Sequence, residues 1–275
     1  MTKNIQNNSI GIMQGRLSPP LDGMIQSFPK KTWRDEFKIA SEIGYEAIEI
    51  IFDGSQNPIF SREGAKEIKQ LADDANIKIS SISNDYSMFF PLFGKTRKKS
   101  LETILQLIER CASIDIPRVG ISFEDNSSIL NELHRNQAIE NMKVILKLAE
   151  ELNIIITIET FLIGANLILF IDQVGSPNLK VNFDTGNSCA YGEDSPATIK
   201  KLGKLIGGIH IKDRKRLFGT TVPLGKGDTD LKGCFQAIKE IGYSGTIIIQ
   251  GARGSDDIAT ALFYKDLVAE YFLQT

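Results

Sequence analysis

The chain has 275 residues, of which 42% are hydrophobic and 24% charged, the composition of an ordinary soluble globular protein. Its 32 basic and 34 acidic residues give a net charge of −2, which argues against nucleic-acid or anionic-membrane binding. Three scattered cysteines exclude a disulfide framework. No apolar run reaches the ~20 residues that span a bilayer, and MTKNIQNNSI lacks a signal-peptide core. We therefore expect no membrane partner and a cytoplasmic location.

Eight apolar runs alternate along the chain with stretches of helical periodicity. In chain order, the predicted strands are Ile10–Leu17, Ala47–Phe52, Lys78–Ser83, Arg118–Phe123, Ile154–Glu159, Lys180–Asp184, Gly208–Ile211 and Thr246–Gln250. The helices that follow them are predicted over Thr32–Ile43, Ser61–Ala75, Thr96–Ile114, Ile129–Leu152, Ala165–Val174, Pro196–Leu205, Leu231–Ile241 and Asp256–Phe272. Thr32 is the expected N-cap of the first helix, and Gly44 ends it.

Strands that alternate with helices predict a parallel sheet. Eight such units in about 250 residues are typical of a closed barrel with the helices outside. An open doubly wound sheet would usually carry a glycine-rich phosphate turn after its first strand, and GRLSPP is not such a turn. We therefore predict an α/β fold in which residues 1–275 form a single (β/α)8 TIM-barrel domain.

Four successive predicted strands end in a polar side chain: Glu159, Asp184, His210 and Gln250. Taken singly, an acidic residue at a strand end is often a helix N-cap, and a lone histidine is often structural. Together they would lie on adjacent walls at the carboxyl end of a barrel, where such folds place their chemistry. Two carboxylates, an imidazole and an amide predict a divalent metal site that suits Mn²⁺, Mg²⁺, Co²⁺ or Zn²⁺.

This set, with Asp184 in FDTGN and His210 in HIKD, resembles the xylose-isomerase-like barrels, a superfamily of sugar and sugar-phosphate isomerases and epimerases. VPLGKGDTDL, residues 222–231, is similar to the loop after strand seven in ketose-phosphate epimerases of that superfamily. The resemblance covers the whole layout and is specific from Glu159 to Arg253. It implies a metal-dependent isomerase or epimerase that acts on a sugar or sugar phosphate through an enediolate.

In the epimerase relatives, two metal-binding glutamates move protons on opposite faces of the substrate. This chain has Glu159 at the first position and Gln250 at the second, and an amide cannot act as a general base. Three interpretations stay open. Glu159 serves as the single base of an aldose–ketose isomerase, a substitute base comes from another strand end, or the barrel binds a sugar without turning it over. The candidate substitutes are Glu49, Asp85, Glu124 and Asp125.

The predicted catalytic residues are thus Glu159, Glu124 and Asp213, the last of which would orient His210 or bind a substrate hydroxyl. Basic residues near the last two strands indicate an anion site, although charge runs are usually solvated. The residues expected to bind substrate are Arg16, Asn187, Lys212, Arg216, Lys226 and Arg253, with Arg214 and Lys215 in the same basic stretch.

Other classes of protein share this barrel. Apurinic endonucleases need three zinc ions, but this chain has only His134, expected at the surface, and His210. A metal-dependent dehydratase of a keto-inositol or similar polyol is an alternative, as is a non-catalytic sugar-binding barrel. The aromatic loop Tyr86–Phe93 predicts a lid or a subunit interface. Because relatives form dimers or tetramers, we expect a homodimer or homotetramer.

Overall fold

Eight parallel strands close into a barrel in this computed structural model, which describes residues 8–274. The strand order is β1-β10-β7-β6-β5-β4-β3-β2. The strands are β1 (Ile10–Met13), β2 (Ala47–Phe52), β3 (Lys78–Asn84), β4 (Arg118–Phe123), β5 (Ile155–Thr160), β6 (Leu179–Asp184), β7 (Ile206–Ile211) and β10 (Ile247–Ile249). The predicted TIM-barrel fold is confirmed.

The helices are α1 (Asp35–Glu42), α2 (Arg62–Asp74), α3 (Tyr86–Phe89), α4 (Arg97–Ala112), α5 (Glu132–Glu151), α6 (Gly164–Val174), α7 (Thr185–Ala190), α8 (Ser195–Leu202), α9 (Leu231–Glu240) and α10 (Asp257–Gln274). All eight predicted helices are present. The short helices α3 and α7 and the small antiparallel ribbon of β8 (Asp213–Arg214) and β9 (Thr221–Val222) were not predicted.

Backbone contacts group the chain into two compact units. The first comprises the described parts of 1–49, 72–78 and 182–275. In it β10 pairs with β1 and β7, so that Ile249 lies beside Ile12 on one side and Ile211 on the other. β1 also pairs with β2, which places Met13 beside Glu49. These isoleucines are at most 1% exposed, because both faces of a parallel barrel sheet are covered.

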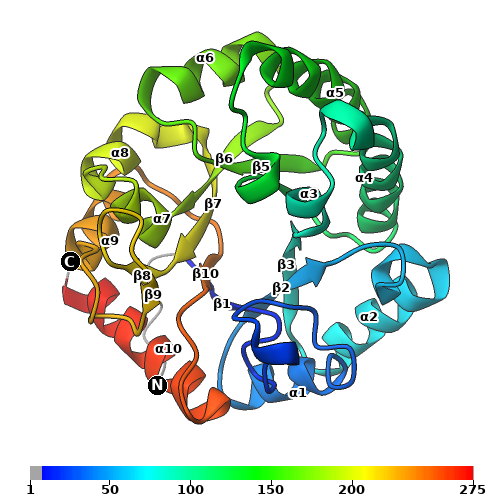
Figure 1. Ribbon diagram of the computed structural model, residues 1–275. Helices are drawn as coiled ribbons and strands as arrows, with labels where there is room; N and C mark the ends of the chain where they lie inside the picture. Colours follow the sequence, from blue (N-terminus) through cyan, green and yellow to red (C-terminus); the bar gives the residue numbers. More distant parts are fainter. Residues whose placement is uncertain (1–7, 275) are drawn as a thin grey trace. The chain divides into compact units, whose positions relative to one another are not determined.

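The second unit comprises 50–71 and 79–181. β4 and β5 pair from Arg118↔Ile155 to Phe123↔Thr160, and this register sets Glu159 beside Ser122. The helices α4 and α5 run next to each other in Figure 1 and pack together. Phe123 meets Phe170 of α6 edge-on, with ring centroids 5.6 Å apart.

The first strand and the first helix are shorter than predicted. β1 stops at Met13 because Gly15 has φ +79°, in the left-handed region that glycine tolerates, and the N–H of Arg16 turns back to the carbonyl of Met13. The first helix begins at Asp35 and not at Thr32. Thr32 donates its hydroxyl to Ser18 at 2.8 Å, so the expected N-cap is wrong.

The aromatic segment Tyr86–Phe93 packs largely within its own unit. Tyr86 stacks on Phe90 with centroids 4.4 Å apart, and Phe93 stacks on His134 at 4.1 Å. His134 is therefore a half-buried packing residue in the first turn of α5, not the surface residue expected. Phe89 is 65% exposed, which leaves one aromatic ring of the segment open to a lid or interface role.

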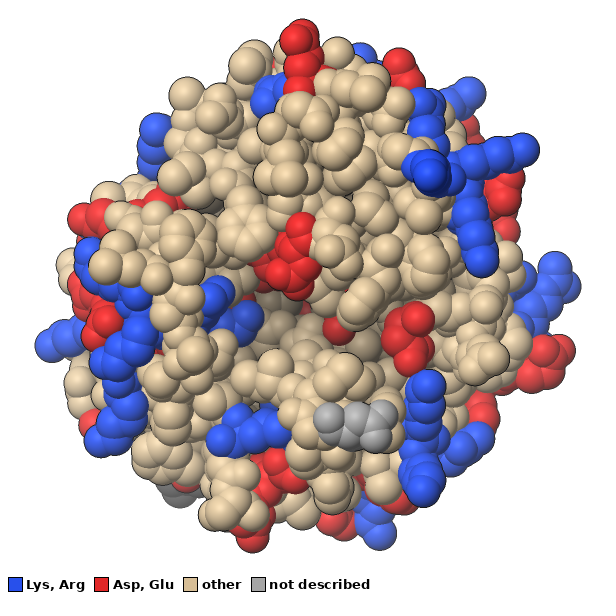
Figure 2. Space-filling view, viewed as in Figure 1, with Lys and Arg blue, Asp and Glu red and all other residues tan. Residues whose placement is uncertain are grey.

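Within residues 8–274, the apolar length of each helix falls short of what a membrane crossing requires. On the face drawn in Figure 2, Lys and Arg side chains form several separate groups with Asp or Glu beside them. On this face, charges of both signs are therefore interspersed.

Candidate functional site

Asp184, the last residue of β6, has a buried carboxylate whose two oxygens differ in environment. Oδ1 accepts a 2.8 Å hydrogen bond from the backbone N–H of Asn187 and caps α7. Oδ2 lies 2.8 Å from Nζ of Lys212, although without the alignment of a hydrogen bond. Oδ1 thus stabilises the start of α7, and Oδ2 faces the ammonium group of Lys212.

His210 on β7 has its ring between two polar side chains of the same unit. Its Nε2 lies 2.7 Å from Oε1 of Glu49, and both side chains are at most 4% exposed. Nδ2 of Asn182 lies 3.1 Å from Nδ1 of the ring. A carboxylate at one nitrogen fixes the orientation and tautomer of an imidazole, as is common for metal-binding histidines. The side chain of Glu49, one of the candidate substitute bases, thus points toward His210.

Gln250 follows β10 directly, and its backbone N–H extends the ladder by donating to the carbonyl of Ile211 at 3.0 Å. Its side-chain Nε2 donates to Oε1 of Gln26 at 2.6 Å. The other end of the amide, Oε1, is buried and has no hydrogen-bond partner among the described residues. Because an unsatisfied buried acceptor costs about 1–3 kcal/mol, this oxygen is suited to a cation or a substrate hydroxyl.

The donor set fits a divalent cation. In the first unit, Asp184 and His210 each offer one ligand atom, and these two atoms lie within 4.8 Å of each other. Glu159, half-buried near the end of β5 in the second unit, is the third candidate ligand. Carboxylate oxygens with one imidazole suit Mn²⁺, Co²⁺ or Zn²⁺, and the oxygens alone suit Mg²⁺. The unsatisfied Oε1 of Gln250 is a fourth candidate donor atom, and it is an oxygen of the kind that such cations bind.

Asp213 holds a loop, and the bonds that its carboxylate makes within residues 8–274 go to backbone N–H groups of that loop. Its Oδ2 accepts from the N–H groups of Gly225 and Gly227 at 2.9 and 2.8 Å, and its Oδ1 accepts from the N–H of Thr229 at 3.2 Å. Three backbone donors shape the segment PLGKGDT around one buried carboxylate. The geometry indicates a structural function, and a catalytic function of Asp213 stays a prediction.

Gly227→Ala tests this loop. A Cβ at Gly227 would overlap the Asp213 carboxylate and the carbonyl of Arg214, so the loop must shift. We expect the free energy of unfolding to fall by about 1–3 kcal/mol in urea titrations. The adjacent exposed Lys226→Ala is the control and should match the parent. Equal stability of Gly227→Ala and the parent would contradict the tight fit.

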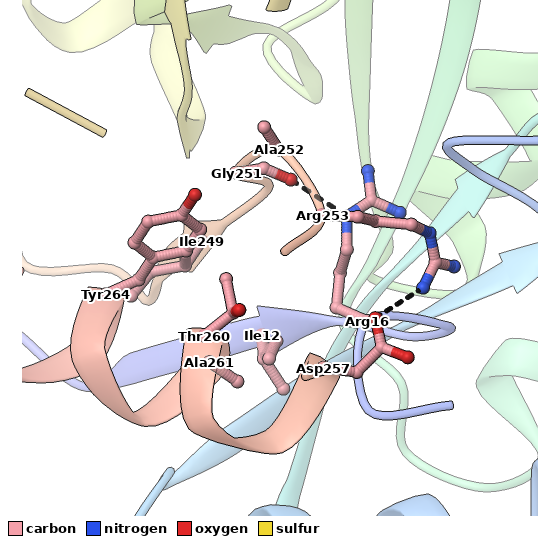
Figure 3. Close-up of a pocket in the computed structure, with 10 residues that line it drawn as sticks. All are labelled: Ile12, Arg16, Ile249, Gly251, Ala252, Arg253, Asp257, Thr260, Ala261 and Tyr264. Carbon is pink, nitrogen blue, oxygen red and sulfur yellow. Dashed lines mark hydrogen bonds and ion pairs between the residues drawn. The ribbon is translucent and has the colours of Figure 1, made fainter. Parts of the chain in front are cut away.

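Arg16 and Arg253 line a pocket between β10 and α10, where each guanidinium is bonded to protein acceptors (Figure 3). Arg16 donates to the carbonyls of Gly251 at 3.1 Å and Ile25 at 2.6 Å. Arg253 donates to the carbonyl of Ser18 at 2.8 Å, to Asp257 at 3.1 Å and to the carbonyl of Gly15. Both arginines therefore tie the segment after β1 to the segment after β10.

The other basic candidates divide into two groups. Arg214 donates to Oδ1 of Asn187 at 2.8 Å, and Lys215 pairs with Asp228 at 2.9 Å. Arg216 and Lys226 are exposed side chains of the loop. The predicted binding of substrate by Arg16, Asn187, Lys212, Arg216, Lys226 and Arg253 stays a prediction, and most of these side chains already have protein partners.

Glu124 is half-buried and directly precedes a 3-10 turn, Asp125–Ser127, in the second unit. Its catalytic role stays a prediction. Asp85, another candidate base, is buried and accepts from the hydroxyl of Ser83 at 2.8 Å.

Three polar residues of the first unit were missed from the sequence: Gln26, Glu36 and Asn182. Asn182 stands two residues before Asp184 on the same strand, so the alternation of side chains places both on one face of the sheet. This spacing could have identified Asn182 from the sequence. Gln26 lies in an irregular segment, and Glu36 is an acidic residue in the first turn of a helix. Neither position carries a pattern that distinguishes it from a solvated side chain.

Comparison with known proteins agrees with this layout. A family described as "Xylose isomerase-like TIM barrel" matches residues 37–262. An L-ribulose-5-phosphate 3-epimerase UlaE of Escherichia coli (strain SMS-3-5 / SECEC) is 20% identical over 232 residues, which cover 79% of this chain and 81% of that protein.

Two solved structures are similar in fold. A xylose isomerase domain protein from Planctomyces limnophilus superimposes with TM-score 0.78 and 19% identity, over 98% of this chain and 99% of that one. D-Psicose 3-epimerase from Clostridium cellulolyticum H10, in a structure with D-tagatose, gives TM-score 0.72 and 17% identity, over 96% and 99% of the chains.

Proposed function

We propose that this chain, which belongs to the family of xylose isomerase-like TIM barrels, is a divalent-metal-dependent isomerase or epimerase of a ketose sugar. The proposal depends above all on one observation in the first unit. Gln250 presents a buried oxygen without a hydrogen bond from the described residues, and Asp184 presents a buried carboxylate oxygen that faces the ammonium of Lys212. His210 lies on the strand between theirs in the sheet order. The names of the relatives, which are 3-epimerases of ketoses or their phosphates, support the same class of substrate.

Glu159, Asp184, His210 and Gln250 are the residues that would hold the cation. When bound, a divalent cation supplies Lewis acidity to the carbonyl and the neighbouring hydroxyl of the sugar. Glu159 would take the proton from the carbon next to the carbonyl and deliver it to the former carbonyl carbon, while the hydroxyl proton passes between the two neighbouring oxygens. Gln250 cannot exchange a proton, so the chemistry we propose uses one carboxylate base, as in aldose–ketose isomerisation.

A sugar without a phosphate group is the substrate we favour. Arg16 and Arg253, two of the basic residues expected near an anion site, instead donate to backbone carbonyls and side chains of the protein. Arginine recognises phosphate best when its donors are free to make paired contacts. A phosphorylated ketose is the second candidate, supported by the phosphate ester in the name of the Escherichia coli relative.

The test is solvent-proton exchange. The metal-stripped protein, alone and with added Mn²⁺, is incubated in D₂O with L-ribulose, D-psicose or L-ribulose 5-phosphate, and the sugar is followed by NMR. We expect deuterium at the carbon next to the carbonyl only when Mn²⁺ is present. Glu159→Gln should lose this exchange, whereas Glu240→Gln, an exposed glutamate paired with Lys200, should keep it.

Two outcomes would count against the proposal. Sugar binding without exchange on any of these sugars would establish the non-catalytic interpretation. Exchange in Glu159→Gln at the parent rate would remove Glu159 as the base and direct attention to Glu124 or Asp85.

A further inference from the structure

An amide ligand has a problem that a carboxylate does not have. A carboxylate presents an acceptor oxygen at either end, whereas the amide of Gln250 presents an oxygen at one end and an NH₂ group, which cannot bind a cation, at the other. If Gln250 takes part in the site, something in the fold must select which end of its amide faces the ligand.

The donors and acceptors around Gln26 make that selection. Arg16 has no acceptor atom, and it donates from Nη2 to Oε1 of Gln26 at 3.3 Å. The same oxygen of Gln26 lies 2.6 Å from Nε2 of Gln250. If the Gln250 amide were turned over, two acceptor oxygens would face each other at that distance. The chain of bonds from Arg16 through Gln26 therefore leaves Oε1 of Gln250 pointing away from Gln26.

Hydrogen bonds hold the guanidinium of Arg16 beside both Gln250 and Gln26. Its Nε donates to the carbonyl of Gly251, the residue after Gln250, and its Nη1 donates to the carbonyl of Ile25, the residue before Gln26. Arg253 also donates to the carbonyl of Ile25, at 3.1 Å. Arg16 is only 7% exposed, so these bonds form away from bulk water.

Strand register places Gln250 on the face of the sheet that carries His210. Ile248 pairs with His210, and side chains two apart on a strand share a face. Gln250 is therefore on the same face as His210, and its Oε1 is the buried oxygen that has no donor among the described residues.

We propose that Gln26, held by Arg16, is the positioning residue that turns Oε1 of Gln250 toward the cation. This inference rests on the proposed metal site and names a determinant of that site. Gln26 does not touch the cation, and it acts by fixing the amide of Gln250.

The experiment measures Mn²⁺ binding by isothermal titration calorimetry, with no substrate present. Loss of an outer partner of a metal ligand weakens metal binding by about 10–100-fold, so Gln26→Leu should raise the Mn²⁺ Kd by at least about tenfold. Gln26→Asn, which is too short to reach Gln250, should do the same and serves if the leucine variant does not fold. Gln236→Leu, an exposed glutamine on α9 that bonds Glu240, is the matched control and should bind as the parent does.

A double-mutant comparison separates positioning from general damage. In Gln250→Glu both ends of the side chain are acceptors, so orientation no longer matters. Gln26→Leu also removes the acceptor oxygen that would face the new carboxylate, so it should not raise the Kd of this variant by more than about threefold. A tenfold loss in both backgrounds would overturn the positioning role. If the parent binds Mn²⁺ and Gln26→Leu binds it equally well, the inference fails and the proposed function stands. If the parent binds no Mn²⁺, both fail.

Discussion

Asp184→Asn should abolish stoichiometric Mn²⁺ binding while leaving the fold intact. The substitution removes one negative charge from a carboxylate whose Oδ2 already faces the ammonium of Lys212. The remaining side-chain oxygen can still accept from the N–H of Asn187 and cap α7. Loss of an outer partner alone weakens metal binding 10–100-fold, so loss of a ligand charge should raise the Kd by at least about a hundredfold.

The structure offers a matched control for this variant. Asp194 caps α8 in the same way, since its Oδ1 accepts from the N–H of Ala197 at 3.0 Å. Asp194→Asn therefore changes the same charge at the same kind of helix end, away from the candidate ligands. Calorimetry with Mn²⁺ and metal analysis of the dialysed proteins should separate the two variants. Equal binding by both would exclude Asp184 as a ligand.

Glu36 should make the stability of the metal-free protein fall as pH rises. Its carboxylate is fully buried, with Oε2 accepting from the N–H of Gly15 at 2.7 Å and Oε1 from the N–H of Leu17 at 3.3 Å. Burial raises the pKa of Glu36 to about 7, although these N–H groups and the charge of Arg253 lower it in part. Dehydration of the carboxylate thus outweighs its hydrogen bonds.

The direction of the pH effect follows from the two states. Between the ordinary pKa of 4.5 and the folded pKa of about 7, the folded protein keeps the proton and the unfolded chain has lost it. Rising pH therefore favours unfolding, by up to about 1.4 kcal/mol per pH unit. From pH 5 to 8 the parent should lose about 2.5 kcal/mol relative to Glu36→Gln, whose amide does not titrate.

Urea unfolding at pH 5, 6, 7 and 8 with EDTA present measures this difference. Glu42→Gln is the control, because Glu42 is an exposed glutamate on the same helix. Its stability should run parallel to that of the parent across the range. Parallel curves for Glu36→Gln and the parent would show that burial does not raise the pKa of Glu36.

Local patterns in the sequence were sufficient for the barrel and for the residue types at its strand ends. The apolar run before Asp184 is typical of a buried strand, and the acidic residue at its end is typical of a helix N-cap. The structure has both the strand β6 and the helix α7 at this place. Caps such as Asp194 and Asp230 bond backbone groups three residues away, so their information is local. Where long-range contacts compete, local prediction failed, as for Thr32, which bonds Ser18 in place of its own helix.

The amino-acid sequence by itself determined eight strand–helix units and the polar residues at the ends of the last four strands, among them an amide, Gln250. Tertiary structure alone decided what those side chains meet. Glu49 reaches His210 across 161 positions, and Gln26 reaches Gln250 across 224. Arg16 and Arg253, which the sequence suggested as substrate-binding residues, bond carbonyls of segments far away in the sequence. Periodicity reports which face a side chain takes, whereas hydrogen-bond partners depend on loops whose positions no local pattern encodes.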